Sequence, residues 1–117
     1  MRILIADDEK EFVDMLNERL RYKNVEMDFA FDGKQALELI RLNHYDLVFL
    51  DHNMPEMTGL ELVRYMKENK IDSKIVMVTG YPAIRGFFAK AIGTDEYLTK
   101  PVQLKDIDEI VEKYRPK

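Results

Sequence analysis

Apolar and polar positions follow two alternating rhythms along the chain. Short apolar runs rich in strand-forming residues are each followed by a longer segment with apolar residues at helical spacing. The pattern predicts strands over residues 2–6, 25–30, 47–50, 75–78 and 96–98, and helices over residues 9–23, 33–42, 58–69, 82–91 and 102–114. Five successive strand–helix units indicate an α/β fold, a five-stranded parallel sheet with five helices on its two faces. Right-handed crossovers make such a sheet doubly wound.

The predicted strands differ in how deeply they are buried. The runs at 47–50 and 75–78 are continuously apolar, as expected of strands that are covered on both faces. Residues 25–30 alternate apolar and polar side chains, which is typical of a half-exposed edge strand. Thr58 is a suitable capping residue for the helix that runs from it to about Asn69.

Length and composition limit the classes of protein to consider. A chain of 117 residues suits one compact domain over residues 1–117, and 46% hydrophobic with 34% charged residues is the balance of a soluble globular protein. The absence of cysteine excludes disulfides and thiolate metal sites. No apolar stretch is long enough to span a bilayer and no leader opens the chain, so we expect a cytoplasmic protein without membrane contact. A net charge of −4 without a basic stripe argues against direct nucleic acid binding by this domain.

Polar side chains gather where the predicted strands end. Asp7 and Asp8 follow the first strand and Asp51 follows the third, whereas Thr79 follows the fourth and Lys100 comes just beyond the fifth. Because the carboxyl ends of strands in an open α/β sheet meet at one edge, these groups are expected to converge. The sequence therefore predicts three carboxylates, a hydroxyl and an ammonium group in one site.

Carboxylates that are held close together need a cation to offset their repulsion. A set of oxygen ligands without cysteine or histidine favours Mg²⁺, which also neutralises and orients a phosphoryl group. Asp51 is then a candidate nucleophile that forms an acyl phosphate, with Lys100 and Thr79 as partners of the phosphate oxygens. Each residue alone has an ordinary structural alternative; Asp7 and Asp8, for example, could simply cap the first helix.

Four short motifs occur in order over essentially the whole chain. They are the acidic pair Asp7-Asp8, the segment Asp51-His52-Asn53-Met54-Pro55 with Gly59 beyond it, Thr79-Gly80-Tyr81, and Tyr97-Leu98-Thr99-Lys100-Pro101. Together they resemble the response-regulator receiver domain of two-component signalling, of the chemotaxis and phosphorelay type. The resemblance implies a flavodoxin-like sheet with the strand order 2-1-3-4-5.

The resemblance also implies a role for each residue of the site. Asp51 accepts a phosphoryl group from the phosphohistidine of a sensor histidine kinase or a phosphotransfer protein. Asp8 and Asp51 bind Mg²⁺ directly, Asp7 holds a metal-bound water, and the backbone carbonyl of Asn53 is a further ligand. Lys100 contacts the phosphoryl group, and the peptide bond that follows Lys100 is expected to be cis.

The same resemblance implies how phosphorylation is read. Thr79 moves towards the phosphoryl group and Tyr97 rotates inward, which changes the surface around the fourth helix, fifth strand and fifth helix. That surface binds a downstream protein target or an output domain, and the domain is a monomer or a phosphorylation-dependent dimer. Such a domain is not an enzyme, although it assists its own phosphorylation and dephosphorylation.

One segment departs from the family pattern. The stretch between Thr79 and Lys100 is about one residue shorter than usual, and Gly86 lies inside the predicted fourth helix. Phe87 and Phe88 follow it, and either one of them is exposed as an anchor for a partner or both are buried by a distorted helix. These departures concern the switching surface and leave the phosphorylation site intact.

Two other functions fit part of the pattern. A haloacid-dehalogenase-type phosphatase also uses an aspartate nucleophile with Mg²⁺, but it needs a second aspartate where this chain has Asn53. A pseudo-receiver would bind partners without phosphorylation. The sequence also leaves open whether the domain is free-standing or part of a longer regulator, in which residues 115–117 would begin a linker.

Overall fold

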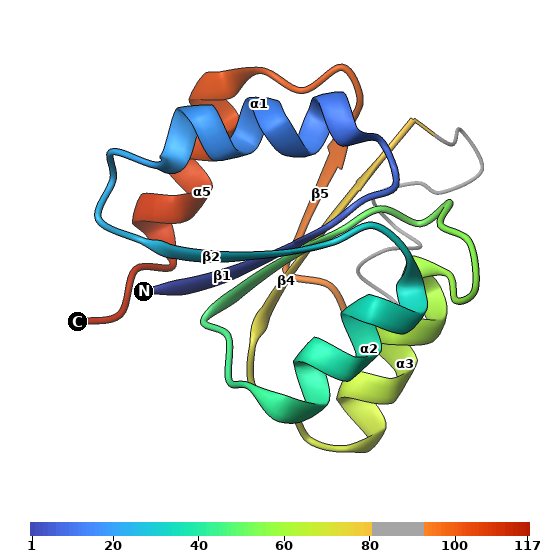
Figure 1. The fold of residues 1–117 in the computed structure, drawn as a ribbon. Helices are drawn as coiled ribbons and strands as arrows, with labels where there is room; N and C mark the ends of the chain where they lie inside the picture. The colour runs from blue at the N-terminus through green and yellow to red at the C-terminus, as the bar shows by residue number, and fades with distance from the viewer. Residues whose placement is uncertain (81–92) are drawn as a thin grey trace.

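The computed structural model describes residues 1–80 and 93–117, apart from the side chain of Thr79. Its centre is a five-stranded parallel sheet with the order β2-β1-β3-β4-β5 (Figure 1). The strands are β1 (Arg2–Ala6), β2 (Glu26–Ala30), β3 (Leu47–Leu50), β4 (Lys74–Thr79) and β5 (Glu96–Thr99). The helices of the described residues are α1 (Lys10–Leu20), α2 (Gly33–Leu42), α3 (Gly59–Glu68) and α5 (Leu104–Lys113).

The predicted α/β class, the parallel sheet and the strand order implied by the resemblance are confirmed. The edge position predicted for residues 25–30 is also confirmed, since β2 is an outer strand with mostly half-buried side chains. Four of the five predicted helices are present. The other one, predicted over residues 82–91 with Gly86, Phe87 and Phe88, lies outside the described residues.

The sheet is covered on both faces, and alternation along each strand decides which face a side chain joins. Leu4 and Val48 face α2 and α3, whereas their neighbours Ile5 and Phe49 face α1 and α5. Figure 1 shows these two helix pairs on opposite sides of the strands. β1 and β3 are therefore buried on both faces, which explains their continuous apolar sequence.

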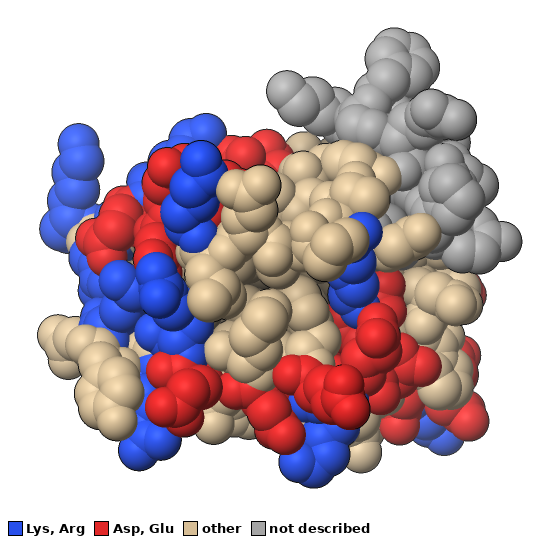
Figure 2. All heavy atoms as spheres, turned by 90° about the horizontal axis from the view of Figure 1, so that it is seen from above, with Lys and Arg blue, Asp and Glu red and all other residues tan. Residues whose placement is uncertain are grey.

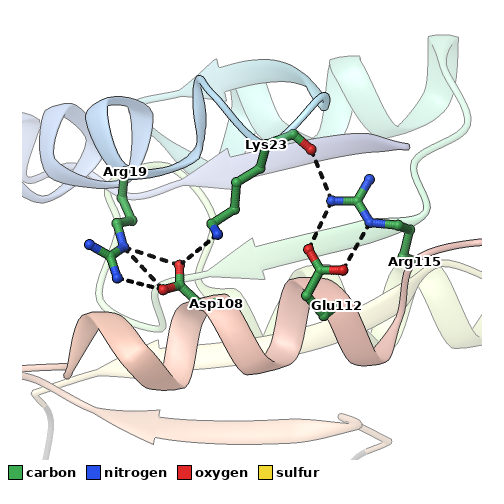
Figure 3. Close-up of polar contacts among 5 residues, drawn as sticks. All are labelled: Arg19, Lys23, Asp108, Glu112 and Arg115. Atoms are coloured by element: carbon green, nitrogen blue, oxygen red, sulfur yellow. Dashed lines mark hydrogen bonds and ion pairs between the residues drawn. The ribbon is translucent and has the colours of Figure 1, made fainter.

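Charged side chains connect α1 and its following loop to α5 at the edge of their apolar contact (Figure 3). Asp108 accepts from the Arg19 guanidinium at 2.5 Å and lies 3.7 Å from the Lys23 ammonium group. Arg115 pairs with Glu112 at 3.1 Å and donates to the backbone carbonyl of Lys23 at 2.9 Å. These contacts fix the C-terminal end of α5 against the loop that follows α1.

The α1–α5 side of the molecule carries an uneven distribution of charge (Figure 2). Lys and Arg side chains gather at the left end of this view, whereas Asp and Glu side chains dominate its lower and right-hand edges. The right-hand end is the one at which the parallel strands finish (Figure 1). Among the described residues, no helix combines the length and the apolar character that crossing a membrane requires.

Candidate functional site

Three carboxylates meet at the carboxyl ends of β1 and β3, as the sequence predicted. The two strands are neighbours with Ala6 opposite Leu50, so the residues that follow them are adjacent. Asp7, Asp8 and Asp51 each offer an oxygen within 4.8 Å of the others. Asp7 and Asp51 are buried, whereas Asp8 is exposed to solvent. Two carboxylates of the cluster are thus shielded from solvent, and the third is accessible to it.

The Lys100 ammonium group joins this cluster from the loop after β5. It lies 2.8 Å from Oδ2 of Asp7 and 3.7 Å from Oδ2 of Asp51. It also donates to the carboxylate of Glu9 and lies 4.7 Å from the centroid of the Phe12 ring. The predicted convergence of Lys100 with Asp7 and Asp51 is therefore observed, whereas its contacts with Glu9 and Phe12 were not predicted.

Burial and charge shift the proton affinity of the two central groups. Burial raises the pKa of Asp7 from 3.8 to about 6, although hydrogen bonds from Lys100 and from the Glu9 amide oppose the shift. Burial alone would lower the pKa of Lys100, but hydrogen bonds to Asp7 and Glu9 outweigh it and raise that pKa. The pKa of Asp7 is thus raised because burial disfavours its charged form more than the contact with Lys100 favours it.

The loop that carries Asp51 is held by backbone contacts. The Asp51 amide donates to the Ala6 carbonyl at 2.9 Å, and the Gly59 amide donates to the His52 carbonyl at 3.0 Å. A Cβ atom on Gly59 would lie 2.6 Å from the Asp51 carbonyl oxygen, so only glycine allows this approach. The Asn53 amide points to the Asp51 carboxylate at 3.4 Å. The glycine of the motif thus packs α3 directly against the Asp51 backbone.

The structure also tests the capping alternatives. Thr58 caps α3 as predicted, in a reciprocal capping box with Glu61. For α1, the N-cap residue is Glu9 and makes no side-chain capping bond. Asp7 lies before the helix and accepts from the Glu9 amide at 2.8 Å, so it orders the preceding turn and does not cap the helix.

Two further predicted residues and one predicted peptide bond lie in β4, in β5 and just after β5. Thr79 ends β4 opposite Thr99, and its side chain lies outside the described residues. Tyr97 is half-buried against the core formed with α2 and α3. The peptide bond between Lys100 and Pro101 is cis, as the resemblance implied.

A cleft of about 760 Å³ opens onto the cluster. Asp8, Asp51 and Lys100 line it together with Asn53, and Glu9 and Glu11 add further carboxylates. Its remaining walls are Phe12, Met15, Gly80, Pro101 and Val102. A phosphoryl group approaching Asp51 through this cleft would meet both an ammonium group and the carboxylates of a cation site.

The donor set fits a hard divalent cation. Every side-chain ligand in the acidic group is a carboxylate oxygen, which is the ligand type that Mg²⁺ prefers. Asp7, Asp8 and Asp51 each offer an oxygen within 4.8 Å of the others, and a bound cation would offset their mutual repulsion. The cleft also leaves the exposed Asp8 accessible from solvent.

Comparisons with known proteins agree with this arrangement. A family model described as the response regulator receiver domain matches residues 3–112. The transcriptional regulatory protein DltR of Streptococcus agalactiae is 33% identical over 92% of this chain and 48% of its own length. The response regulator ArlR of Staphylococcus saprophyticus is 32% identical over 97% of this chain and 50% of its own. The chain thus spans about half the length of these curated relatives.

Solved structures give the same result. The receiver domain of the Francisella response regulator 1452 superposes with a TM-score of 0.90 at 27% identity, covering 97% of this chain and 94% of its own. The response regulator TrrA of Thermotoga maritima, solved in complex with Mg²⁺-BeF, has a TM-score of 0.85 at 35% identity and covers 97% of both chains.

Proposed function

The chain belongs to the response regulator receiver domain family, and from this premise we propose that it is a phosphorylation-activated switch with Asp51 as the phosphoacceptor. Residues 1–117 form one such receiver domain. The observation that carries the proposal is the position of the buried Asp51 carboxylate, which lies in an open cleft beside two further carboxylates and the Lys100 ammonium group. A phosphoryl donor can reach Asp51 through the cleft, and Lys100 can pair with the negative charge of the phosphoryl group.

In the proposed reaction, a carboxylate oxygen of Asp51 attacks the phosphorus atom of a phosphohistidine. A bond forms between this oxygen and phosphorus while the phosphorus–nitrogen bond to the donor imidazole breaks, and the imidazole takes a proton from solvent. Lys100 donates to a phosphoryl oxygen, as a charge-assisted hydrogen bond. The residues that line the cleft hold Asp51 in place, so that positioning and charge supply most of the acceleration of phosphoryl transfer.

The site also fits the cation that the chemistry needs. Asp8, Asp51 and the backbone carbonyl of Asn53 would hold Mg²⁺ directly, and Asp7 would hold it through a water molecule. When bound, Mg²⁺ supplies positive charge that offsets the carboxylates and the transferred phosphoryl group. The TrrA structure in complex with Mg²⁺-BeF supports this assignment by similarity.

Phosphorylation would then shift the molecule between two states. A phosphoryl group adds about −1.5 to −2 charges and three acceptor oxygens, which favour the state in which Thr79 and Lys100 reach them. Moving a population from 1:99 to 99:1 takes about 5.5 kcal/mol, which a few charge-assisted hydrogen bonds of about 1.5–3 kcal/mol each can supply. Tyr97 would follow inward, changing the surface around the fourth helix, β5 and α5.

The partners follow from this scheme. A sensor histidine kinase or a phosphotransfer protein donates the phosphoryl group in the cytoplasm. A downstream protein target or an output domain reads the changed surface, and the relatives DltR and TctD are transcriptional regulatory proteins. The domain itself would not contact nucleic acid or membrane, and it would act as a monomer or as a phosphorylation-dependent dimer. It is a signalling domain that assists its own phosphorylation and dephosphorylation.

The experiment that tests the function is intact-mass measurement after incubation with acetyl phosphate and Mg²⁺. We expect the gain of one phosphoryl group in the wild type, and no gain in the Asp51→Asn variant or with excess chelator. Asp14→Asn, which removes an exposed carboxylate on α1 that pairs with Lys10, is the matched control and retains the gain. A wild type that gains no phosphoryl group with acetyl phosphate or with candidate kinases would instead favour a pseudo-receiver.

A further inference from the structure

The Lys100 ammonium group is closer to Asp7 and Glu9 than to Asp51. Its distance to Asp7 is 2.8 Å and its distance to Asp51 is 3.7 Å, and it makes a hydrogen bond with Glu9. The ammonium group thus donates to Glu9 and forms an ion pair with Asp7, and both contacts are shorter than its distance to Asp51. Phe12 lies against the same group, with its ring centroid 4.7 Å from Nζ. The contacts that hold the Lys100 ammonium group therefore come from α1 and from the turn between β1 and α1.

Asp7 and Glu9 have different positions in this arrangement. Asp7 is only 1% exposed and belongs to the acidic group that fits a cation. The Glu9 side chain is 62% exposed and lies outside that group. It is nevertheless in direct contact with the lysine that the proposed function assigns to the phosphoryl group. A negative charge at Glu9 therefore opposes the transfer of Lys100 to any new anion on Asp51.

From this geometry we infer that Glu9 is a positioning residue that competes with the phosphoryl group for Lys100. The Glu9 carboxylate holds the ammonium group towards α1 while Asp51 is unphosphorylated. An incoming dianionic phosphoryl group has to share Lys100 with Glu9 or displace it. Glu9 thus slows phosphorylation of Asp51 and weakens the binding of phosphoryl analogues. The inference rests on the proposed function and adds a residue to which that function assigns no role.

The cleft contains a matched control for the general effect of charge. Glu11 lines the same cleft and is exposed, and the described contacts include none between it and Lys100. Glu9→Gln and Glu11→Gln each remove one negative charge from the entrance used by an anionic donor. Only Glu9→Gln also removes the competitor for Lys100. Comparing the two variants separates competition at Lys100 from simple repulsion of the donor.

The test measures the rate constant of phosphorylation by acetyl phosphate with Mg²⁺ in the full chain, followed by intact mass. We expect Glu9→Gln to raise this rate constant about two- to five-fold, the size expected when one partly exposed ion pair is removed. Glu11→Gln should change it by less than about 1.5-fold, since only the long-range charge is altered. Glu9→Asp, which keeps the charge, should stay closer to the wild type than Glu9→Gln does.

A second measurement follows equilibrium binding of beryllium fluoride, a phosphoryl analogue, in the presence of Mg²⁺. Its affinity should rise in Glu9→Gln and stay near that of the wild type in Glu11→Gln, with unchanged thermal unfolding of both variants as the check on folding. The inference is overturned if Glu9→Gln reacts at the wild-type rate or more slowly, or if Glu11→Gln gives the same gain. A wild type that accepts no phosphoryl group would instead contradict the proposed function.

Discussion

Asp7 is the residue whose ionisation depends most clearly on the fold. Its pKa rises from 3.8 to about 6 mainly because of burial, and the neighbouring charge of Asp51 adds to the effect. The folded state therefore binds this proton more tightly than the unfolded state does. The resulting stabilisation is fully present below pH 3.8 and is lost as the pH rises through about 6. The metal-free site is thus a source of instability at neutral pH.

This shift predicts how Asp7 affects the free energy of unfolding. A pKa of about 6 in place of 3.8 corresponds to about 3 kcal/mol in total, roughly half of which is lost between pH 5 and pH 7.5. In chelator, the wild type should therefore lose about 1.5 kcal/mol relative to Asp7→Asn over that interval. Denaturant unfolding of both proteins at the two pH values measures the difference. A difference that is the same at both pH values would contradict the assignment.

Gly59 is a second residue with a direct structural requirement. Gly59→Ala places a Cβ atom 2.6 Å from the Asp51 carbonyl oxygen and 2.9 Å from the His52 Cα atom, so the loop has to shift. We expect a loss of about 1–3 kcal/mol in unfolding free energy, with slower phosphorylation. Gly80→Ala is the control, because within residues 1–80 and 93–117 its new Cβ atom meets only the Lys100 Cβ atom, at 3.8 Å. Equal stability of the two variants in denaturant unfolding would refute this explanation.

Most of the candidate site could be predicted because it depends on strand ends. Asp7, Asp51 and Lys100 follow apolar runs directly or within two residues, and the topology of a parallel sheet brings such positions together. The contact between Glu9 and Lys100 depends instead on how one turn and one long side chain are arranged. Spacing along the chain carries no information on that arrangement. The only signal in the sequence was a third acidic residue after the Asp7-Asp8 pair.

Among the four described helices, α3 has the most complete N-terminal cap. The Thr58 hydroxyl accepts from the Glu61 amide at 3.2 Å, and the Glu61 side chain accepts from the Thr58 amide at 3.0 Å. Because Gly59 begins this helix against the Asp51 backbone, the cap also fixes the loop that carries Asp51. The capping box therefore connects helix stability with the geometry of the site.

Removal of this cap gives a prediction at the scale of the helix. Thr58→Ala should reduce the unfolding free energy by about 1 kcal/mol, because the Glu61 amide in the first turn of α3 loses its acceptor. Thr58→Ser keeps the hydroxyl and should retain most of the stability. Denaturant unfolding compares the two variants. If serine and alanine destabilise the protein equally, the hydroxyl is not the cause.

The contact between α1 and α5 gives a prediction that depends on salt. Arg19 donates to Asp108, and Arg19 and Lys23 hold the pKa of Asp108 below its usual value. Asp108→Asn should lower the melting temperature at low ionic strength, and the difference should shrink in high salt because these charges are near the surface. Glu109→Gln, at an exposed position of the same helix, is the control and should have little effect. If the loss in melting temperature of Asp108→Asn does not change with salt, lost packing and not lost ion pairing is its cause.

Helix ends were predicted less well than helix positions. The first helix was expected to reach residue 23 but ends at Leu20, where the Lys23 amide donates to the Leu20 carbonyl in a tighter turn that leads to Asn24, with a positive φ of 59°. The last helix was expected from residue 102 but begins at Leu104, because Gln103 has an extended backbone. Before the last helix, apolar spacing extends beyond the regular hydrogen bonds because Val102 in the flanking turn also packs against the core. After the first helix it does not, since Tyr22 is 78% exposed.

On the scale of the whole molecule, hydrophobic patterning was sufficient to predict the layered architecture. Two helix pairs bury opposite faces of one parallel sheet, and the alternating side chains of β1 and β3 supply both cores. The strand order did not follow from the pattern, because alternation determines which face a side chain joins but not which strands are neighbours. That order came from the resemblance and is confirmed by the pairing of β1 with both β2 and β3.

The placement of the site follows from the same architecture. All five strands run in parallel, so their carboxyl ends form one edge where Asp7, Asp8, Asp51 and Lys100 meet. The ion pairs among Arg19, Asp108 and their neighbours lie where α1 ends, away from the acidic cluster where it begins (Figures 1 and 3). The ion pairs between α1 and α5 and the candidate site therefore lie at opposite ends of α1. Changes at Asp108 should alter stability without altering the chemistry at Asp51.

The most direct test of the account is to locate the phosphoryl group on the chain. After incubation with acetyl phosphate and Mg²⁺, borohydride reduction converts an acyl phosphate on aspartate into homoserine, which peptide mass spectrometry then locates. If Asp51 is the phosphoacceptor, homoserine appears at position 51, and its formation depends on Mg²⁺ and is abolished by chelator. Homoserine at another carboxylate, or none under conditions in which a known receiver domain is labelled, would contradict the assignment of Asp51 as the phosphoacceptor.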